Sequence, residues 1–257
     1  MNNATARETP EMPAFVSHAT FDEYAADYEQ ALNKGVSLSG ESPAYFAEKR
    51  VHYTAQWLQE LGEPAARSIA DFGCGVGSST PHFRRHFPQA ELLGLDVSAP
   101  SIQRARELHS DASRFLLLND AGSVVDCDLV YCNGVFHHIA PHNRGEWLAR
   151  VRQMLVAGGL FALWENNPWN PGTRMVMRRI PFDREAIPLT PGEARAMLVQ
   201  SGFEIIGTRF RFYFPKVLRI LRGLERFGER VPLGAQYCVL ARKPAKRTES
   251  RAITAVS

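Results

Sequence analysis

The feature that most constrains the fold of this chain is a glycine-rich turn between a strand-like and a helix-like segment. Asp71-Phe72-Gly73-Cys74-Gly75-Val76-Gly77 overlaps the end of the apolar run Ser68–Phe72 and precedes a helical pattern over Ser79–His86. Glycines let the backbone turn tightly and approach another molecule with no Cβ in the way. In an open parallel sheet such a turn lies at the carboxyl edge of a strand, beside the crevice where ligands bind.

The rest of the chain alternates short apolar runs with helical patterns. The predicted strands are Ser68–Phe72, Glu91–Leu95, Arg114–Leu118, Asp128–Cys132, Leu160–Trp164, Glu204–Phe214 and Gln236–Ala241. The predicted helices between them are Ser79–His86, Ser98–Leu108, Asn143–Leu155 (ended by Gly158-Gly159), Arg174–Arg179, Thr190–Ser201 and Lys216–Arg230. The alternation predicts an α/β fold: a Rossmann-like, doubly wound, mostly parallel seven-stranded sheet with an N-terminal helical cap and C-terminal insertions.

The ends of the chain differ from this core in composition. We expect residues 1–20 to be a disordered leader, residues 21–64 a helical cap, residues 65–242 the sheet domain, and residues 243–257 a disordered tail. No stretch reaches the roughly 20 apolar residues that a membrane-spanning helix needs, and the polar start has no signal-peptide core.

Composition narrows the function classes. The formal net charge is only +3, which gives no electrostatic case for binding nucleic acid. The four cysteines have no CxxC spacing, so neither a zinc site nor a disulfide framework is expected, and no metal is assigned. This cysteine usage fits a reducing cytoplasm.

The spacing of the glycines separates two kinds of nucleotide site. A dinucleotide-binding turn needs GxGxxG, but the third glycine position is Ser78, which disfavours a nicotinamide oxidoreductase. Here an acidic residue precedes the glycines instead, as D-x-G-x-G-x-G. Asp96 ends the next strand, where a carboxylate can accept both hydroxyls of a ribose; capping the following helix is its structural alternative.

These motifs resemble the class I S-adenosylmethionine-dependent methyltransferases, of a small-molecule type similar to the quinone-biosynthesis methyltransferases. The resemblance covers about Arg67 to Trp164, and includes the segment around Asn133 and the Leu155–Gly159 turn. It implies S-adenosyl-L-methionine as cofactor. The residues that it assigns to cofactor binding are Asp71, Gly73, Cys74, Gly75, Gly77, Asp96, Val97, Asn119, Asp120, Ala121, Asn133 and Gly134.

Methyl transfer from a sulfonium is an in-line displacement, so the protein chiefly aligns the acceptor and excludes water. A base is needed only if the acceptor must lose a proton. The candidates are His137 and His138, after the fourth strand, and Glu165, after the fifth. Histidine accepts protons near neutral pH, but in the methyltransferases that this chain resembles one histidine of such a pair usually packs structurally, which is the favoured interpretation.

The acceptor is expected to contact residues outside the glycine motifs, in the N-terminal helices and in residues 165–230. The predicted contacts are Asn166, Asn167 and Trp169 in a loop from Glu165 to Arg174, and Tyr24 and Tyr28 in the cap. Turn formation in the loop and core packing in the cap are the alternatives.

The segment Phe210–Phe227 has aromatic residues followed by alternating apolar and basic residues. Such a basic amphipathic helix can rest on a membrane surface or cover an apolar pocket. It can also pack on the sheet with a solvated basic face, which is the interpretation that the sequence favours.

The sequence therefore predicts a cytoplasmic enzyme that methylates O, N or C of a small-molecule acceptor. Two alternatives stay open: a lipid-like acceptor, such as a quinone or glycolipid intermediate, and a cofactor-binding protein without turnover. A peripheral membrane contact, and the choice between monomer and homodimer, are also left open.

Overall fold

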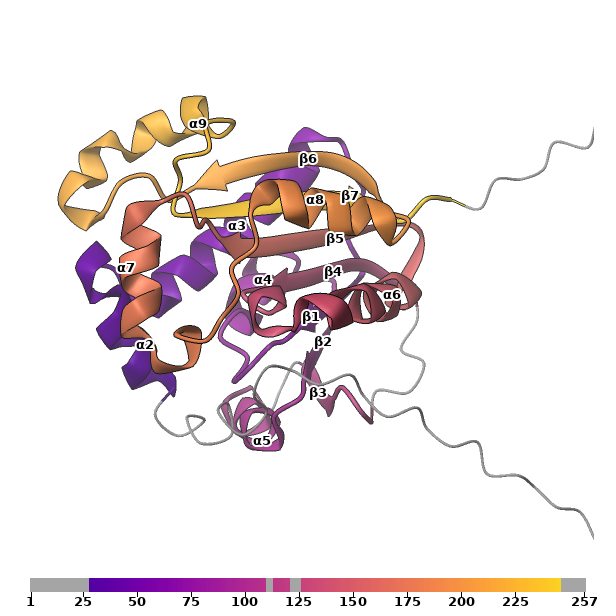
Figure 1. The fold of residues 1–257 in the computed structure, drawn as a ribbon. Coiled ribbons are helices and arrows are strands. Elements are labelled where there is room, and N and C mark those ends of the chain that lie inside the picture. Colours follow the sequence, from indigo (N-terminus) through magenta and orange to yellow (C-terminus); the bar gives the residue numbers. More distant parts are fainter. Residues whose placement is uncertain (1–27, 110–112, 121–125, 246–257) are drawn as a thin grey trace, which may run out of the picture.

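A seven-stranded sheet lies between two layers of helices (Figure 1). The computed structural model describes residues 28–109, 113–120 and 126–245, with side chains from Leu32 onward. The strands follow the order β3-β2-β1-β4-β5-β7-β6. They are β1 (Ser68–Phe72), β2 (Glu91–Asp96), β3 (Ser113–Leu117), β4 (Cys127–Asn133), β5 (Leu155–Asn166), β6 (Glu204–Arg211) and β7 (Gln236–Arg242). The predicted fold class is confirmed.

The described helices flank this sheet and extend past its carboxyl edge. The α-helices are α2 (Tyr28–Val36), α3 (Pro43–Glu60), α4 (Thr80–His86), α5 (Ala99–Leu108), α6 (Arg144–Met154), α7 (Pro171–Arg179), α8 (Pro191–Gln200) and α9 (Glu225–Gly228). The 3-10 helices are η1 (Ser37–Ser39), η2 (Phe136–His138), η3 (Pro141–Asn143), η4 (Pro181–Asp183) and η5 (Lys216–Leu224). Within the described residues, no helix combines the length and apolarity required to cross a membrane.

Strand register brings three turns of the chain to one edge. β1 pairs in parallel with β2 and β4, and Phe72 at its end lies level with Leu95 and Cys132. The residues that follow these three strands therefore meet at the carboxyl edge. Only β7 is antiparallel to its neighbours, β5 and β6.

Alternating side chains on the strands bury the two faces against different helices. In β4, Leu129 and Tyr131 face the cluster that includes α3 and α4, whereas Val130 and Cys132 face the cluster that includes α6 and α8. The largest buried side chain on the second face is Trp147 of α6, which contacts Phe72 edge-on. Burial on both faces explains the continuous apolar runs that predict these strands.

Several predicted element boundaries are wrong. β6 ends at Arg211 rather than at Phe214, and α7 begins at Pro171, inside the predicted loop, rather than at Arg174. The helix α6 ends at Met154, and Gly158-Gly159 lies inside β5 rather than after a helix. A Cβ on Gly159 would lie 3.1 Å from the carbonyl oxygen of Cys127, so close pairing with β4 explains this glycine better than a helix stop does. β5 also continues to Asn166, which places Glu165 and Asn166 on the strand and not in a loop.

The predicted helix Lys216–Arg230 is wrong in type. It is a 3-10 helix with a kink at Leu218, followed by the single α-turn α9. No residue of η5 is buried, so the predicted packing of this segment on the sheet is also wrong. The leader, the tail from residue 246, Tyr24 and Ala121 lie outside the described residues, and so does the side chain of Tyr28. The division into domains stays a prediction.

Candidate functional site

The glycine turn after β1 adopts backbone angles that favour glycine. Gly73, Gly75 and Gly77 have φ values of +77°, +53° and +78°. At Gly73 a Cβ would lie 2.2 Å from Cγ2 of Val135, so no side chain fits there. The amides of Gly73 and Cys74 donate to the carbonyl of Leu95, at 2.7 Å and 3.0 Å, which ties the turn to the end of β2.

Asp96 at the end of β2 faces this turn. Its Oδ2 accepts a hydrogen bond from the amide of Gly75 at 2.8 Å, and its Oδ1 accepts one from the amide of Ser98 at 2.9 Å. Ser98 itself caps α5, with its hydroxyl accepting from the amide of Ser101. Asp96 thus braces the turn and the start of α5 together, and it still lines the cavity described below.

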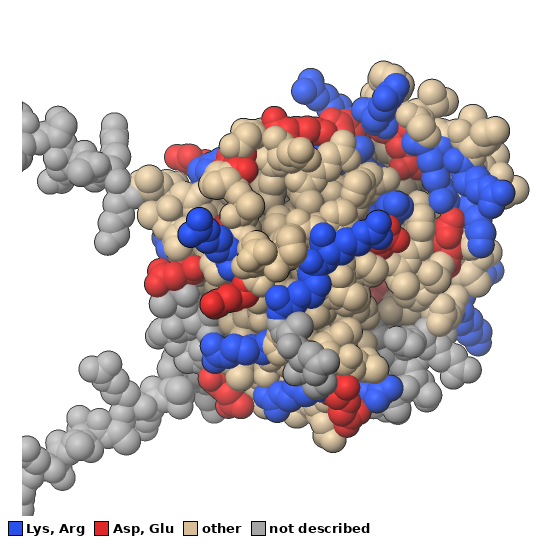
Figure 2. All heavy atoms as spheres, turned by 180° about the vertical axis from the view of Figure 1, so that it is seen from behind, with Lys and Arg blue, Asp and Glu red and all other residues tan. Residues whose placement is uncertain are grey.

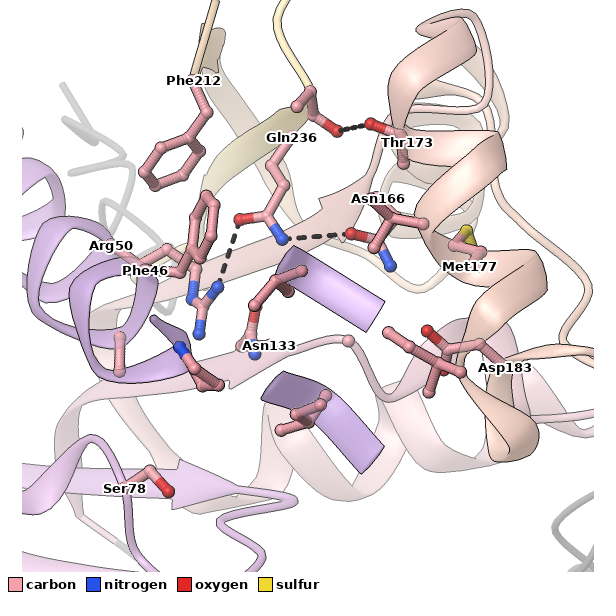
Figure 3. Close-up of a pocket in the computed structure, with 18 of the residues that line it drawn as sticks. Phe46, Arg50, Ser78, Asn133, Asn166, Thr173, Met177, Asp183, Phe212 and Gln236 are labelled. Atoms are coloured by element: carbon pink, nitrogen blue, oxygen red, sulfur yellow. Dashed lines mark hydrogen bonds between the residues drawn. The ribbon is translucent and has the colours of Figure 1, made fainter. Parts of the chain in front are cut away.

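Asp71 at the end of β1 and Arg50 in α3 are both buried and interact electrostatically. Burial raises the pKa of Asp71 to about 7, the Asp96 carboxylate adds to the rise, and Arg50 of α3 opposes it. Arg50 donates to Oε1 of Gln236 at 3.2 Å, and Gln236 donates to Oδ1 of Asn166 at 3.0 Å (Figure 3). Among the described residues, the buried Nε of Arg50 has no hydrogen-bond partner.

One cavity of about 630 Å³ joins these groups, a volume typical of small-molecule sites. The walls include β1, β2 and β4 residues at the carboxyl edge, together with α2, α3, α7, η4 and the segment after β6. Of the residues predicted from the sequence, the cavity is lined by Asp71, Gly73, Cys74, Gly75, Asp96, Val97, Asn133, Gly134, His137, His138 and Asn166.

The two predicted histidines sit in a buried network. Nδ1 of His137 lies 2.5 Å from Oε2 of Glu165, whose Oε1 accepts from the amide of Phe136 at 2.9 Å. On the other side, Oδ1 of Asp183 lies 3.7 Å from Nε2 of His137 and 3.3 Å from Nε2 of His138. Glu165 comes from β5 and Asp183 from η4, so the network connects two separate parts of the chain.

The two histidines differ in protonation. Burial alone would lower the pKa of His137, but the Glu165 carboxylate, the nearby Asp183 carboxylate and the hydrogen bond to Glu165 raise it to about 10. Burial and the neighbouring His137 charge lower the pKa of His138. Burial would raise the pKa of Asp183, yet its interactions with both histidines hold it at about 2. The network therefore favours the cationic form of His137 and the neutral form of His138.

Several predicted site residues do not line the cavity. Asn167 is fully buried and donates to the carbonyls of Pro232 and Gly234, so it holds two loops together. Trp169 is 52% exposed on the outer surface. Glu165 lies behind His137. Gly77 packs against the side chain of His109, while Asn119 and Asp120 are exposed.

The far end of the cavity is mostly apolar. It is lined by Leu32, Val36, Leu38, Phe46, Met175, Val176, Met177, Ile180, Phe182, Phe212 and Phe214. Besides Arg50, the arginine among the described lining residues is Arg222, which pairs with Glu41 at 2.8 Å and lies over the ring of Tyr45. The charge of His137 is balanced by Glu165 and Asp183. This end therefore offers apolar contact and little positive charge.

Comparisons with known proteins agree with this geometry. Residues 70–161 match a family model described as a methyltransferase domain. Trans-aconitate 2-methyltransferase of Afipia carboxidovorans is 31% identical over 144 residues, which are 55% of each chain. The enzyme of that name from Acidovorax ebreus is 26% identical over 204 residues, 71% of this chain and 76% of that one.

A solved structure supports the fold. The magnesium protoporphyrin IX methyltransferase of Synechocystis PCC 6803, with bound SAH, superposes with a TM-score of 0.58 at 16% identity. The superposition covers 87% of this chain and 96% of that one. The chain is thus similar to methyltransferase domains over residues 70–161 and shares the fold of solved S-adenosylmethionine-dependent methyltransferases. The matched part is only about half the length of the first relative above. The name of that relative therefore does not establish the acceptor of this chain.

Two charged residues that line the cavity were missed by sequence analysis. Arg50 belongs to the expected helical pattern, but nothing local distinguishes it from a solvated arginine. Asp183 follows Pro181-Phe182 in a segment with no motif. Only the fold places Arg50 beside Asp71 and Asp183 beside the histidines, so no local signal identifies either residue.

Proposed function

We propose that this chain transfers the methyl group of S-adenosylmethionine to a small-molecule acceptor bound in the cavity. The observation that carries the proposal is the grouping of Asp71, the Gly73–Gly77 turn and Asp96 along one wall of that cavity. The four cysteines are free thiols, which supports the cytoplasmic location expected from the sequence.

The chemistry of these groups matches each part of the donor. Asp96 has a carboxylate at the edge where ribose hydroxyls would be held, with Val97 and Leu118 as apolar neighbours for the adenine. Asp71 and Arg50 line the same cavity and interact electrostatically, and a carboxyl with a guanidinium suits the methionine ammonium and carboxylate. At Gly75, which lines the cavity, the Cβ position has no atom within 4 Å, so the absent side chain leaves room for close approach.

The bound donor supplies a methyl group that is already activated. The residues of the chain then have to align the acceptor, exclude water and, for a protonated nucleophile, take a proton. His138 lines the cavity as a neutral imidazole and is the better base of the two histidines. His137 is protonated and fixed between Glu165 and Asp183, so we assign it to positioning.

We propose an acceptor with an apolar body. A tricarboxylate such as trans-aconitate needs several cations, yet Arg222 is already paired with Glu41 and Arg50 serves the donor end. Asp183 adds a negative charge to the same region. The apolar side chains of α2 and α7 instead favour a molecule that buries hydrocarbon beside the reacting atom.

Calorimetric titration with S-adenosylhomocysteine tests the donor site. Asp96→Ala is expected to weaken binding about 100-fold, since a charged hydrogen-bonding group is removed. Glu91→Ala is the control, because Glu91 is an exposed carboxylate at the opposite end of β2 from Asp96 and outside the cavity, and it should bind like the native chain. Equal affinity of the Asp96 variant and the native chain, with the fold intact, would refute the assignment.

Product formation separates turnover from binding alone. The native chain is incubated with labelled S-adenosylmethionine and two acceptor sets, polycarboxylates including trans-aconitate and apolar alcohols, phenols and amines. Methylation confined to the apolar set supports the proposal. Methylation of trans-aconitate alone contradicts the proposed acceptor class, and tight donor binding with no product from a broad metabolite extract favours the non-catalytic alternative.

A further inference from the structure

The segment η5–α9 exposes its apolar side chains and faces the body of the protein with polar ones. Val217, Ile220 and Phe227 are 85%, 89% and 72% exposed, and Leu224 is 56% exposed. Together with Leu221 they form a group of exposed apolar side chains on η5 and α9, which we term the outer stripe. An amphipathic segment on a globular protein normally buries this stripe.

Polar anchors fix the segment in this orientation. Arg222 donates to the carbonyl of Phe214 and pairs with Glu41. Glu225 is buried and accepts hydrogen bonds from the amides of Tyr213 and Phe214 at 3.1 Å and 3.2 Å. Because Arg222 and Glu225 hold one side of the segment against the protein, the outer stripe on the other side faces solvent.

The charge of the molecule is concentrated on the same segment. Residues 216–230 contain five basic side chains (Lys216, Arg219, Arg222, Arg226 and Arg230) and two acidic ones (Glu225 and Glu229), a formal charge of +3. The whole chain also carries +3, so its other residues are balanced. Figure 2 shows basic side chains gathered at the edge of the molecule where this segment projects.

We propose that the outer stripe and its flanking arginines dock on an anionic lipid surface. Arg219 and Arg226 are exposed beside the stripe, and the guanidinium of Arg226 lies 4.5 Å from the ring centre of Phe227. Apolar side chains that enter the acyl boundary, with arginines at the headgroup level, are the pattern of interfacial helices. A protein partner would match the apolar stripe, but the local excess of positive charge favours the anionic surface.

The cavity lies beside the outer stripe, so docking on lipid would affect how an acceptor enters. Phe214, Pro215 and Arg222 line the cavity and directly adjoin the outer stripe, and the exposed side chains of Leu38 and Met175 lie on the same cavity. In a docked protein, the apolar end of the cavity would face the lipid boundary. An amphiphilic acceptor would then enter the cavity without crossing water. This consequence rests on the proposed methyl transfer, whereas the docking itself does not.

Co-sedimentation of the full chain with vesicles tests the docking without any measurement of activity. We expect binding to vesicles of phosphatidylglycerol and phosphatidylcholine, weak binding to phosphatidylcholine alone, and loss of binding as salt is raised. Ile220→Ser with Phe227→Ser should weaken binding at least tenfold, because two exposed apolar anchors are lost. Val199→Ser is the matched control, since Val199 is 57% exposed on α8, and it should leave binding unchanged.

A second variant tests the charge. Arg219→Glu with Arg226→Glu should abolish the preference for anionic vesicles, and Arg104→Glu on α5 should not. Two outcomes overturn the proposal: no sedimentation of the native chain with any vesicle, or lipid-independent dimers that the Ile220 and Phe227 substitutions convert to monomers in light scattering. If binding is seen and no methyl transfer is detected, the docking stands and the proposed function fails.

Discussion

The donor end and the acceptor end of the cavity are built in different ways. The donor end consists of turns that directly follow β1, β2 and β4, and its geometry is set by backbone angles and backbone hydrogen bonds such as those of Gly73 and Gly75. The acceptor end consists of apolar side chains on α2, α7 and the segment after β6, which are far apart in the sequence. Backbone angles and hydrogen bonds thus fix the donor end, whereas apolar side chains form the acceptor end.

The two ends of the cavity are therefore suited to two kinds of ligand. Backbone geometry tolerates little change, which suits a donor that is the same for every reaction. Apolar side chains on helices can be exchanged with modest effect, which suits an acceptor that differs between relatives. The buried network of Glu165, His137 and Asp183 joins the two ends, and its removal should affect the molecule most.

Glu165→Gln breaks the connection between the two ends and has the largest expected effect. Removing one charge of a buried ion pair costs about 3–5 kcal/mol of unfolding free energy. His137 has a pKa raised from 6.5 to about 10 in the folded state, so its contribution is complete below pH 6.5 and is lost as pH rises through 10. Denaturant titrations from pH 6 to 10.5 should show this loss in the native chain and a flatter profile in the variant.

The pH dependence of the native chain's stability tests the network of Glu165, His137 and Asp183 directly. Stability of the native chain that stays constant between pH 7 and 10 would mean that His137 is not held as a cation. Glu185→Gln, at an exposed glutamate near η4, is the control for loss of a carboxylate.

Gly73→Ala tests the rigidity of the donor end. The new Cβ would lie 2.2 Å from Val135 in a backbone region that alanine rarely adopts, so the turn must shift. We expect donor affinity to fall about 100-fold, as for other displacements of about 1 Å at a site. Gly62→Ala provides the control, because Gly62 has the same sign of φ (+71°) and no atom within 4 Å of its Cβ position. Similar donor affinities for the two variants would contradict a special role of the turn.

The pH dependence of donor binding tests the charge at the same end. Asp71 has a pKa of about 7, and only its ionised form attracts the methionine ammonium, so affinity should rise roughly tenfold from pH 6 to 8. Calorimetry in buffers of matched ionic strength measures this rise. The Asp71→Asn variant should bind the donor more weakly, and its donor affinity should depend little on pH. If its affinity rises with pH as steeply as that of the native chain, another group is responsible for the titration.

Met177→Ala tests the tolerance of the acceptor end and has the smallest expected effect. Met177 is 6% exposed and lines the cavity on α7. Its truncation should raise the acceptor KM about three- to tenfold through lost apolar contact, with the donor Kd unchanged. Met154→Ala, at a methionine of similar burial outside the cavity, should leave the KM unchanged. A donor Kd that changes with Met177 would break the separation between the two ends.

The same contrast explains what the sequence could predict. Asp71, Gly73 and Asp96 belong to contiguous motifs whose spacing is imposed by strand, turn and helix geometry, so local patterns identify them. Arg50 and Asp183 reach the cavity only through tertiary packing, and no local pattern marks them. The segment after β6 shows the limit most clearly, because its amphipathic pattern predicts burial on the sheet, whereas Arg222 and Glu225 turn its apolar stripe outward.

A crystal structure of the chain with S-adenosylhomocysteine tests the central claim most directly. The account predicts ribose hydroxyls within hydrogen-bond distance of Asp96, the methionine ammonium beside Asp71, and the sulfur facing the apolar end near His138. Density for the compound at another place on the protein, or with the adenine at the apolar end, would contradict it.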